Sequence, residues 1–101
     1  MNMLEAKLFF DKDELTGTQS LEEFIMQFLI RNNISGATAI RGDSGFGPNQ
    51  LLKRPDMLFS FDERPMLIIF IDEEEKIRKT LTELKTLVKN CVIVTTQVEK
   101  W

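Results

Sequence analysis

A chain of 101 residues with a formal net charge of −3 is long enough for one domain of average size and too short for two. Its single cysteine, Cys91, excludes an internal disulfide, and the lack of histidine excludes a metal site of the usual histidine and cysteine kind. The longest apolar run, residues 66–71, is far shorter than the roughly 20 residues that a membrane-spanning helix needs, and the N-terminus lacks the features of a secretory signal. We therefore expect one domain over residues 1–101, located in the cytoplasm and not inserted into a membrane.

The first part of the chain predicts a strand followed by a helix. Apolar residues alternate along residues 3–10, which is the period of a β-strand, and residues 11–18 are polar and form a connection. Ser20 and Glu23 have the spacing of a capping box, so the helix is expected to begin there. Its apolar face consists of Leu21, Phe24, Ile25, Phe28 and Leu29.

The second part predicts two more strands, a helix and a final strand. Strands are expected at residues 36–42, 66–71 and 91–98, and Asp72 is the expected N-cap of the second helix. The apolar face of that helix consists of Ile77, Leu81, Leu84, Leu87 and Val88. The order βαββαβ is that of the ferredoxin-like fold, an α+β class with an antiparallel sheet, its first and third strands central and two helices on one face.

The third strand, residues 66–71, is apolar on both faces. A strand buried on both sides needs a second cover, and no other segment is left to supply it. We therefore expect another copy of the chain to pack on the open face of the sheet, since closed homo-oligomers are the usual solution. The alternative is an apolar patch that stays in contact with water.

The end of the second strand and the long connection after it contain the candidate binding residues, which are Arg41, Gly42, Gly45, Phe46, Gly47 and Arg54. Glycines at this spacing let a backbone take positive φ and approach a ligand, and two arginines can clamp a phosphate or carboxylate. The glycine spacing matches neither the dinucleotide fingerprint nor the P-loop. A flexible loop whose glycines only turn the chain is the other interpretation.

The segment from Gly36 to Gly42, running into Gly45-Phe46-Gly47, and the later Asp72-x-x-Glu75-Lys76-Ile77 together resemble the short PII-like family of bacterial and archaeal proteins of unknown function. The resemblance covers nearly the whole chain. It implies a ferredoxin-like fold, a homotrimer, and clefts between subunits for adenine nucleotides or similar small anions. It also implies that residues 43–56 signal to a target protein such as a membrane transporter.

One departure from the classical PII pattern concerns the connection between the second helix and the last strand. Residues 88–91 lack the glycine- and lysine-containing loop that cradles ATP phosphates in those proteins. The resemblance therefore does not specify ATP as the ligand.

Other functions remain open on the sequence alone. A trimeric interaction module without any ligand would have the same pattern, and in a small enzyme the acid-base chemistry would fall to groups such as Asp43 or Asp62. Cys91, on a β-branched strand with no activating neighbour, is expected to be a small buried hydrophobe. The negative net charge and the missing RNA-recognition signature argue against nucleic acid as a partner. We expect a ligand-binding protein and not an enzyme.

Overall fold

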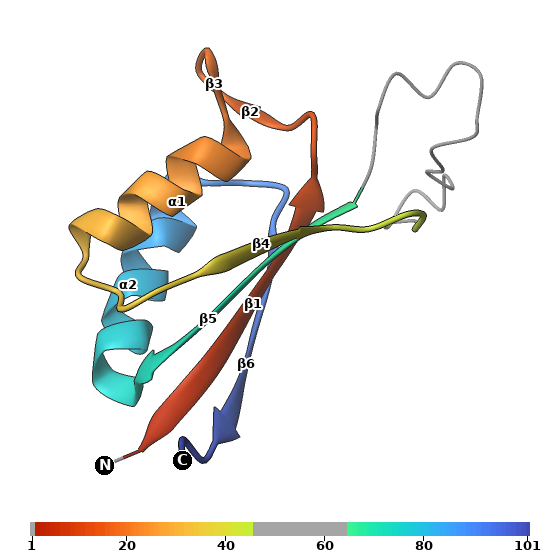
Figure 1. Cartoon of the computed structure of the whole chain (residues 1–101). Helices are drawn as coiled ribbons and strands as arrows, with labels where there is room; N and C mark the ends of the chain where they lie inside the picture. Colours follow the sequence, from red (N-terminus) through yellow and green to blue (C-terminus); the bar gives the residue numbers. More distant parts are fainter. Residues whose placement is uncertain (1, 46–64) are drawn as a thin grey trace.

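The strands and helices follow the predicted order, with one small hairpin added. The structure is a computed structural model that describes residues 2–45 and 65–101. Its elements are β1 (Met3–Asp11), β2 (Leu15–Thr16), β3 (Gln19–Ser20), α1 (Leu21–Arg31), β4 (Thr38–Arg41), β5 (Pro65–Glu73), α2 (Glu74–Leu87) and β6 (Val92–Val98) (Figure 1). Neither helix is long and apolar enough to cross a bilayer, in the part of the chain that is described.

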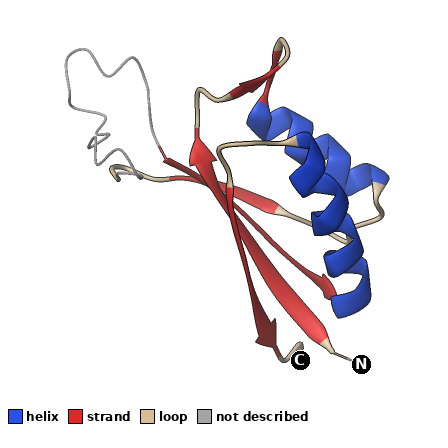
Figure 2. Cartoon of the chain, turned by 180° about the vertical axis from the view of Figure 1, so that it is seen from behind, coloured by secondary structure: helices blue, strands red, loops and turns tan. Residues whose placement is uncertain are grey.

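The main sheet is antiparallel and has the strand order β4-β5-β1-β6. β1 and β5 occupy its centre, as predicted for the first and third main strands. Both helices lie on one face of this sheet (Figure 2). The predicted α+β, ferredoxin-like fold is therefore confirmed.

The segment between β1 and α1 differs from the prediction. Instead of an irregular connection over residues 11–18, it contains a two-stranded hairpin in which β2 pairs with β3. Gly17 lies between these strands with a φ of +64°, a left-handed conformation that glycine adopts without steric cost. Strands of two residues are too short to show a period in the sequence, which is why the pattern did not indicate them.

The core lies between the sheet and the two helices. Alternate residues of the two central strands point into it, and α1 contributes the face that the sequence predicts. The buried apolar residues of these three elements are Leu4, Ala6, Leu8, Phe10, Met66, Ile68, Phe70, Leu21, Ile25, Phe28 and Leu29. The period-two and i, i+3, i+4 patterns therefore identified the core correctly.

The predicted apolar face of α2 contains one error. Ile77, Leu84 and Val88 are buried, but Leu87 is 49% exposed. At 3.6 residues per turn, Leu87 lies about 80° around the helix axis from Ile77, on the flank of the stripe. Thr80 is buried in this helix instead, with 2% of its surface exposed.

The N-terminus of α1 is capped by Ser20, as predicted. Its side-chain oxygen accepts a hydrogen bond from the Glu23 N–H at 3.2 Å. The carboxylate of Glu23 accepts from the side chain of Gln27, one turn further along the helix, at 3.3 Å. The serine half of the predicted capping box is therefore confirmed.

Replacing Ser20 with alanine removes the hydroxyl oxygen that satisfies this N–H, so we expect the free energy of unfolding to fall by about 1 kcal/mol. Urea denaturation followed by circular dichroism measures the change. The control is Thr18→Ala in the exposed turn of the hairpin, which should change the free energy by less than about 0.5 kcal/mol. Equal losses in the two variants would contradict a specific role for the cap.

The face of the sheet opposite the helices is also largely apolar. Leu67 and Ile69 of β5 are half-buried, Ile71 is 40% exposed, and Phe9 of β1 is 42% exposed. None of the described elements covers this face (Figure 2). The sequence was therefore right that β5 is apolar on both sides.

Candidate ligand-binding site

The end of β4 and the start of β5 are fixed to each other. Arg41 and Met66 are partners in the antiparallel ladder. One residue further, the Gly42 N–H donates a hydrogen bond of 2.8 Å to the Pro65 carbonyl. The two points at which the chain enters and leaves the predicted ligand loop are thus held side by side.

Gly42 and Gly45 both lie against the ring of Pro65. A Cβ atom added to Gly42 would lie 2.8 Å from Pro65 Cγ, and one added to Gly45 would lie 3.4 Å from the same atom. Neither glycine has a positive φ, so this part of the predicted reason is wrong for Gly42 and Gly45, while the close approach of a ligand stays a prediction. At Gly42 the reason is the close approach of the proline ring, which leaves no room for a side chain.

A Gly42→Ala substitution forces the added methyl group against this stiff ring, and we expect it to lower the free energy of unfolding by about 1 to 3 kcal/mol. The matched control is Gly36→Ala, since a Cβ there meets no atom within 4 Å. That variant should lose no stability, because alanine also reduces the freedom of the unfolded chain. Chemical denaturation of both variants decides the matter, and equal stabilities would contradict the packing argument.

Arg41 is exposed at the end of β4. Strand alternation places it on the same side as Ala39, which packs against the core, and hence on the side of the helices. Within the described part of the chain, its guanidinium pairs with no carboxylate. An unpaired guanidinium is suited to bidentate binding of a phosphate or carboxylate.

The structure brings together only part of the predicted site. Arg41, Gly42 and Gly45 lie at one end of the sheet, around Pro65. Phe46, Gly47 and Arg54 lie outside the described residues. The predicted clamp between the two arginines and the stacking role of Phe46 therefore stay predictions.

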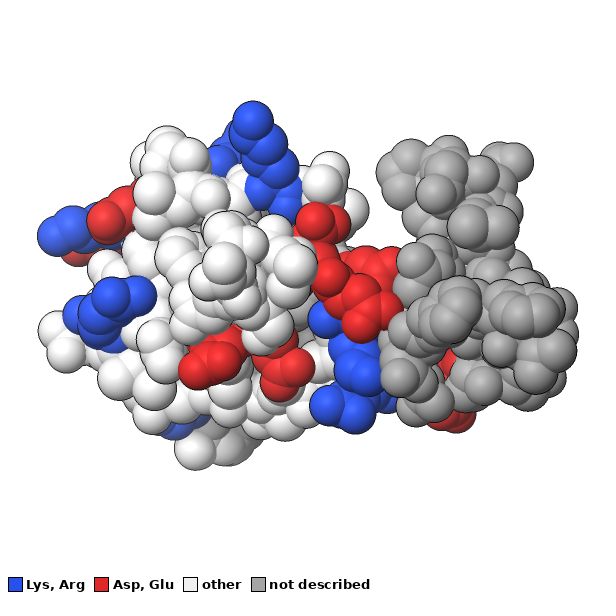
Figure 3. Space-filling model, turned by 90° about the horizontal axis from the view of Figure 1, so that it is seen from above, with Lys and Arg blue, Asp and Glu red and all other residues white. Residues whose placement is uncertain are grey.

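Acidic groups also reach this end of the sheet, which the charge distribution along the sequence did not indicate. Asp11, the last residue of β1, is the ladder partner of Pro65. Its carboxylate accepts a hydrogen bond from the Asp13 N–H at 3.1 Å. The described face at this end shows cationic and acidic side chains next to each other (Figure 3). This end of the molecule therefore carries charges of both signs.

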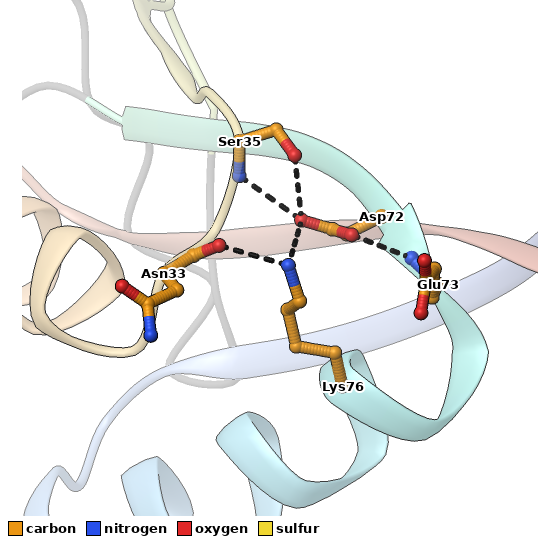
Figure 4. A network of polar contacts seen from close by, with 5 residues as sticks. All are labelled: Asn33, Ser35, Asp72, Glu73 and Lys76. Carbon is orange, nitrogen blue, oxygen red and sulfur yellow. Dashed lines mark hydrogen bonds and ion pairs between the residues drawn. The ribbon is translucent and has the colours of Figure 1, made fainter.

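The opposite end of β5 carries a polar network centred on the buried carboxylate of Asp72. Its Oδ2 atom accepts hydrogen bonds from the Ser35 N–H and hydroxyl, both at 3.0 Å, and forms an ion pair with Lys76 Nζ at 3.3 Å (Figure 4). Its Oδ1 atom accepts from the Glu73 N–H at 2.8 Å. Lys76 also donates to the Asn33 carbonyl at 2.9 Å. The network joins the start of α2 to the connection between α1 and β4.

The sequence interpretation of Asp72 was wrong. The N-cap of α2 is Glu73, which makes no side-chain capping bond. Asp72 still belongs to the strand, where it is the partner of Leu4. The i, i+4 spacing of Asp72 and Lys76 was the signal for their ion pair, but the pairing with Ser35 spans 37 positions and has no local signature.

Burial raises the pKa of the Asp72 carboxyl, but hydrogen bonds from Glu73, Ser35 and Lys76 outweigh it and hold the pKa below its ordinary value of 3.8. A carboxyl whose pKa is lowered by folding stabilises the native state above its unfolded pKa. This contribution is lost as the pH falls through the lower, folded pKa. The network is therefore complete at neutral pH and weakens in acid.

We expect Asp72→Asn to lower the free energy of unfolding by about 2 kcal/mol at pH 7, because charge-assisted hydrogen bonds are lost. The difference in free energy of unfolding between the variant and the wild type should narrow as the pH falls below 4. Denaturation curves at several pH values measure this, with Glu83→Gln on the exposed side of α2 as the control. A gap that is constant with pH would contradict the role of the ionised carboxylate.

The connection between α2 and β6 is short and packed. Val88 is buried, and Asn90 has a φ of 57°. Cys91 lies directly before β6 and is half-buried, so the prediction of a buried residue on the strand is only partly right, although the side chain does pack against the core. Burial raises the pKa of its thiol to about 11, so the thiol is protonated at neutral pH. A hollow of about 430 Å³ beside it, between α2 and β6, is lined by residues that include Leu81, Lys85 and Cys91 and not by Arg41.

Comparison with known proteins identifies the family. Residues 3–100 match the model of the DUF190 family, described as "Uncharacterized ACR, COG1993". The chain belongs to the DUF190 family. Two proteins of Aquifex aeolicus (strain VF5), each named "UPF0166 protein", are similar to it. One is 29% identical over 101 residues, covering 100% of this chain and 99% of that protein. The other is 25% identical over 79 residues, covering 78% and 75%.

Solved structures of CPII, a nitrogen regulatory PII-like protein from Thiomonas intermedia K12, have the same fold as this DUF190 chain. A structure of CPII bound to ADP, AMP and bicarbonate matches with a TM-score of 0.64 at 17% identity, covering 99% of this chain and 91% of that one. A structure bound to ADP and bicarbonate matches with a TM-score of 0.60 at 18% identity, again covering 99% and 91%. The expected likeness to PII proteins is confirmed at the level of fold.

Proposed function

We propose that this DUF190 protein is a cytoplasmic PII-like regulator, and not an enzyme, that assembles as a homotrimer. It binds a small anionic ligand of the adenine-nucleotide type in clefts between subunits. The residues proposed to hold the ligand are Arg41, Gly42, Gly45, Phe46, Gly47 and Arg54. Residues 43–56 carry the signal to a target protein such as a membrane transporter.

The observation that carries this proposal is the junction of β4 with β5. Arg41 is an exposed arginine, and the residue after it, Gly42, is held against β5 by its hydrogen bond to the Pro65 carbonyl. Because the backbone at Arg41 is already fixed, only the arginine side chain has to be ordered when an anion binds, and this limits the entropy cost of binding. The ligands in the structures of CPII, which are ADP, AMP and bicarbonate, are all anions.

The signalling step requires that the ligand bind one conformation of residues 43–56 better than another. A ligand shifts an equilibrium only by the difference between its affinities for the two states. Because Gly42 is fixed to Pro65, a ligand bound at Arg41 would contact the chain at the point where these residues begin. A contact at that position can differ between the two conformations of residues 43–56, and can therefore favour one of them.

The rival proposal is a trimeric interaction module that binds its target without a ligand. The apolar sheet face opposite the helices supports this proposal too, and the proposal needs no role for Arg41. The connection at residues 88–91 has no glycine, so a phosphate cradle of the classical PII kind is missing there in either case. Binding measurements separate the two proposals.

The test is thermal-shift screening of the purified chain with ADP, AMP, ATP and bicarbonate, followed by titration calorimetry. A ligand present at 100 times its Kd should stabilise the folded state by about 2.7 kcal/mol, which raises the melting temperature. Arg41→Ala should weaken binding by about tenfold or more, because a charge-assisted hydrogen bond is lost. If no anion shifts the melting temperature of a folded sample, the interaction module is favoured.

The control for the arginine is Arg78→Ala. Arg78 is an exposed arginine of α2 that is paired with Glu74 at 2.7 Å, away from the end of the sheet where Arg41 lies. Its removal should leave the Kd unchanged. Equal effects of the two substitutions would show that only net charge matters, and would remove Arg41 from the proposed site.

A further inference from the structure

The sheet face opposite the helices carries one charged pair among apolar side chains. We call this surface the open face. Register and alternation place on it Met3, Glu5, Lys7, Phe9, Asp11, Thr38, Ile40, Pro65, Leu67, Ile69, Ile71, Glu73, Val92, Val94, Thr96 and Val98. Asp11 and Glu73 lie at the two ends of the ladder between β1 and β5, so Glu5 and Lys7 are the only ionisable residues of this set in its interior.

Three of the four cross-strand partners of these two charges are apolar. Across the ladder to β5, Glu5 is the partner of Ile71 and Lys7 the partner of Ile69. Across the ladder to β6, Lys7 is the partner of Val94 and Glu5 the partner of Thr96. Lys7 Nζ lies 3.5 Å from Glu5 Oε1, and the side chains are only 40% and 24% exposed. The pair is thus already partly removed from water in a single chain.

Covering the open face with a purely apolar surface would bury both charges without further partners. Burial of a charge costs free energy unless the charge is paired and hydrogen-bonded. A suitable partner must therefore present a cation and an anion at a spacing that matches Glu5 and Lys7. A second copy of the chain meets this condition by identity, since it carries the same two groups with the same separation.

We propose that Glu5 and Lys7 set the alignment of copies packed through their open faces, with Lys7 of one copy paired to Glu5 of the next. This inference rests on the assembly that we propose as part of the function, and it names the residues that select its geometry. Around a closed ring, Lys7 of each copy pairs with the next copy and Glu5 with the previous one, so that neither charge of this pair is left over. A shifted alignment would separate Lys7 from Glu5 of the next copy.

The test is charge reversal within the pair. Glu5→Lys and Lys7→Glu each place two like charges two residues apart on one strand face, and again between copies. Either substitution should weaken self-association by at least about 100-fold, as expected when one partner of a buried ion pair is removed. The combined Glu5→Lys/Lys7→Glu variant restores opposite charges both within and between copies, and it should recover most of the lost association.

Sedimentation velocity over a concentration series measures the association, and circular dichroism checks that each variant is folded. The control is reversal of the exposed ion pair on α2, with Glu74→Lys and Arg78→Glu made singly and together; association should not change. Glu5→Gln and Lys7→Met are milder single variants in case a reversal does not fold. Each leaves one uncompensated charge and should still weaken association.

The outcomes separate this inference from the proposed function. A wild-type chain that is monomeric at tens of micromolar overturns both. An oligomer that tolerates every single reversal overturns the role of Glu5 and Lys7 and leaves the proposed assembly intact. A combined variant that associates no more strongly than the single variants also overturns the role of Glu5 and Lys7. Binding of another occupant, such as a lipid vesicle, to a monomeric wild type would show that the open face has a different partner.

Discussion

The antiparallel ladder between β1 and β5 is the constraint on which the other features depend. It runs without interruption from Met3 paired with Glu73 to Asp11 paired with Pro65. One side of these two strands supplies the sheet's part of the core, and the other side supplies most of the open face. The ends of the same ladder place Pro65 beside Gly42 and Asp72 beside Ser35. A shift of one residue in this register would move every side chain of the shifted strand to the opposite face. It would also break the contacts at both junctions, Gly42 with Pro65 and Asp72 with Ser35.

The two junctions have different physical characters. At Asp72 a buried carboxylate is fully satisfied by backbone and side-chain donors, so it fixes structure and leaves little capacity to bind anything else. At Arg41 the charged group is exposed and unpaired in the described part of the chain, while the backbone next to it is fixed. Satisfied groups stabilise a fold, and unsatisfied groups on rigid elements are available for ligands. This contrast is why the β4 to β5 junction, and not the Asp72 network, is the candidate site.

Much of the fold was predictable from the sequence, because it depends on periods that are visible locally. The alternation of Leu4, Ala6, Leu8 and Phe10 and the helical spacing from Leu21 to Leu29 each fixed a face of the core. The errors at Asp72 and Gly42 have non-local causes. Asp72 was assigned to a cap because its partner Ser35 is distant in sequence, and Gly42 was given a conformational role because the ring of Pro65 comes from another strand. The acidic group at the same end of the sheet as Arg41 was missed for the same reason, since Asp11 reaches this end only through its pairing with Pro65.

The hydrogen bond from Gly42 to Pro65 also has a consequence for the entropy of folding. It joins two residues that are distant in the chain, so forming it requires the chain between them to close. The entropy cost of closing a chain rises only slowly with the number of residues enclosed, by about 0.6 kcal/mol for each doubling. A few residues more or fewer between Gly42 and Pro65 would therefore change this closure cost very little.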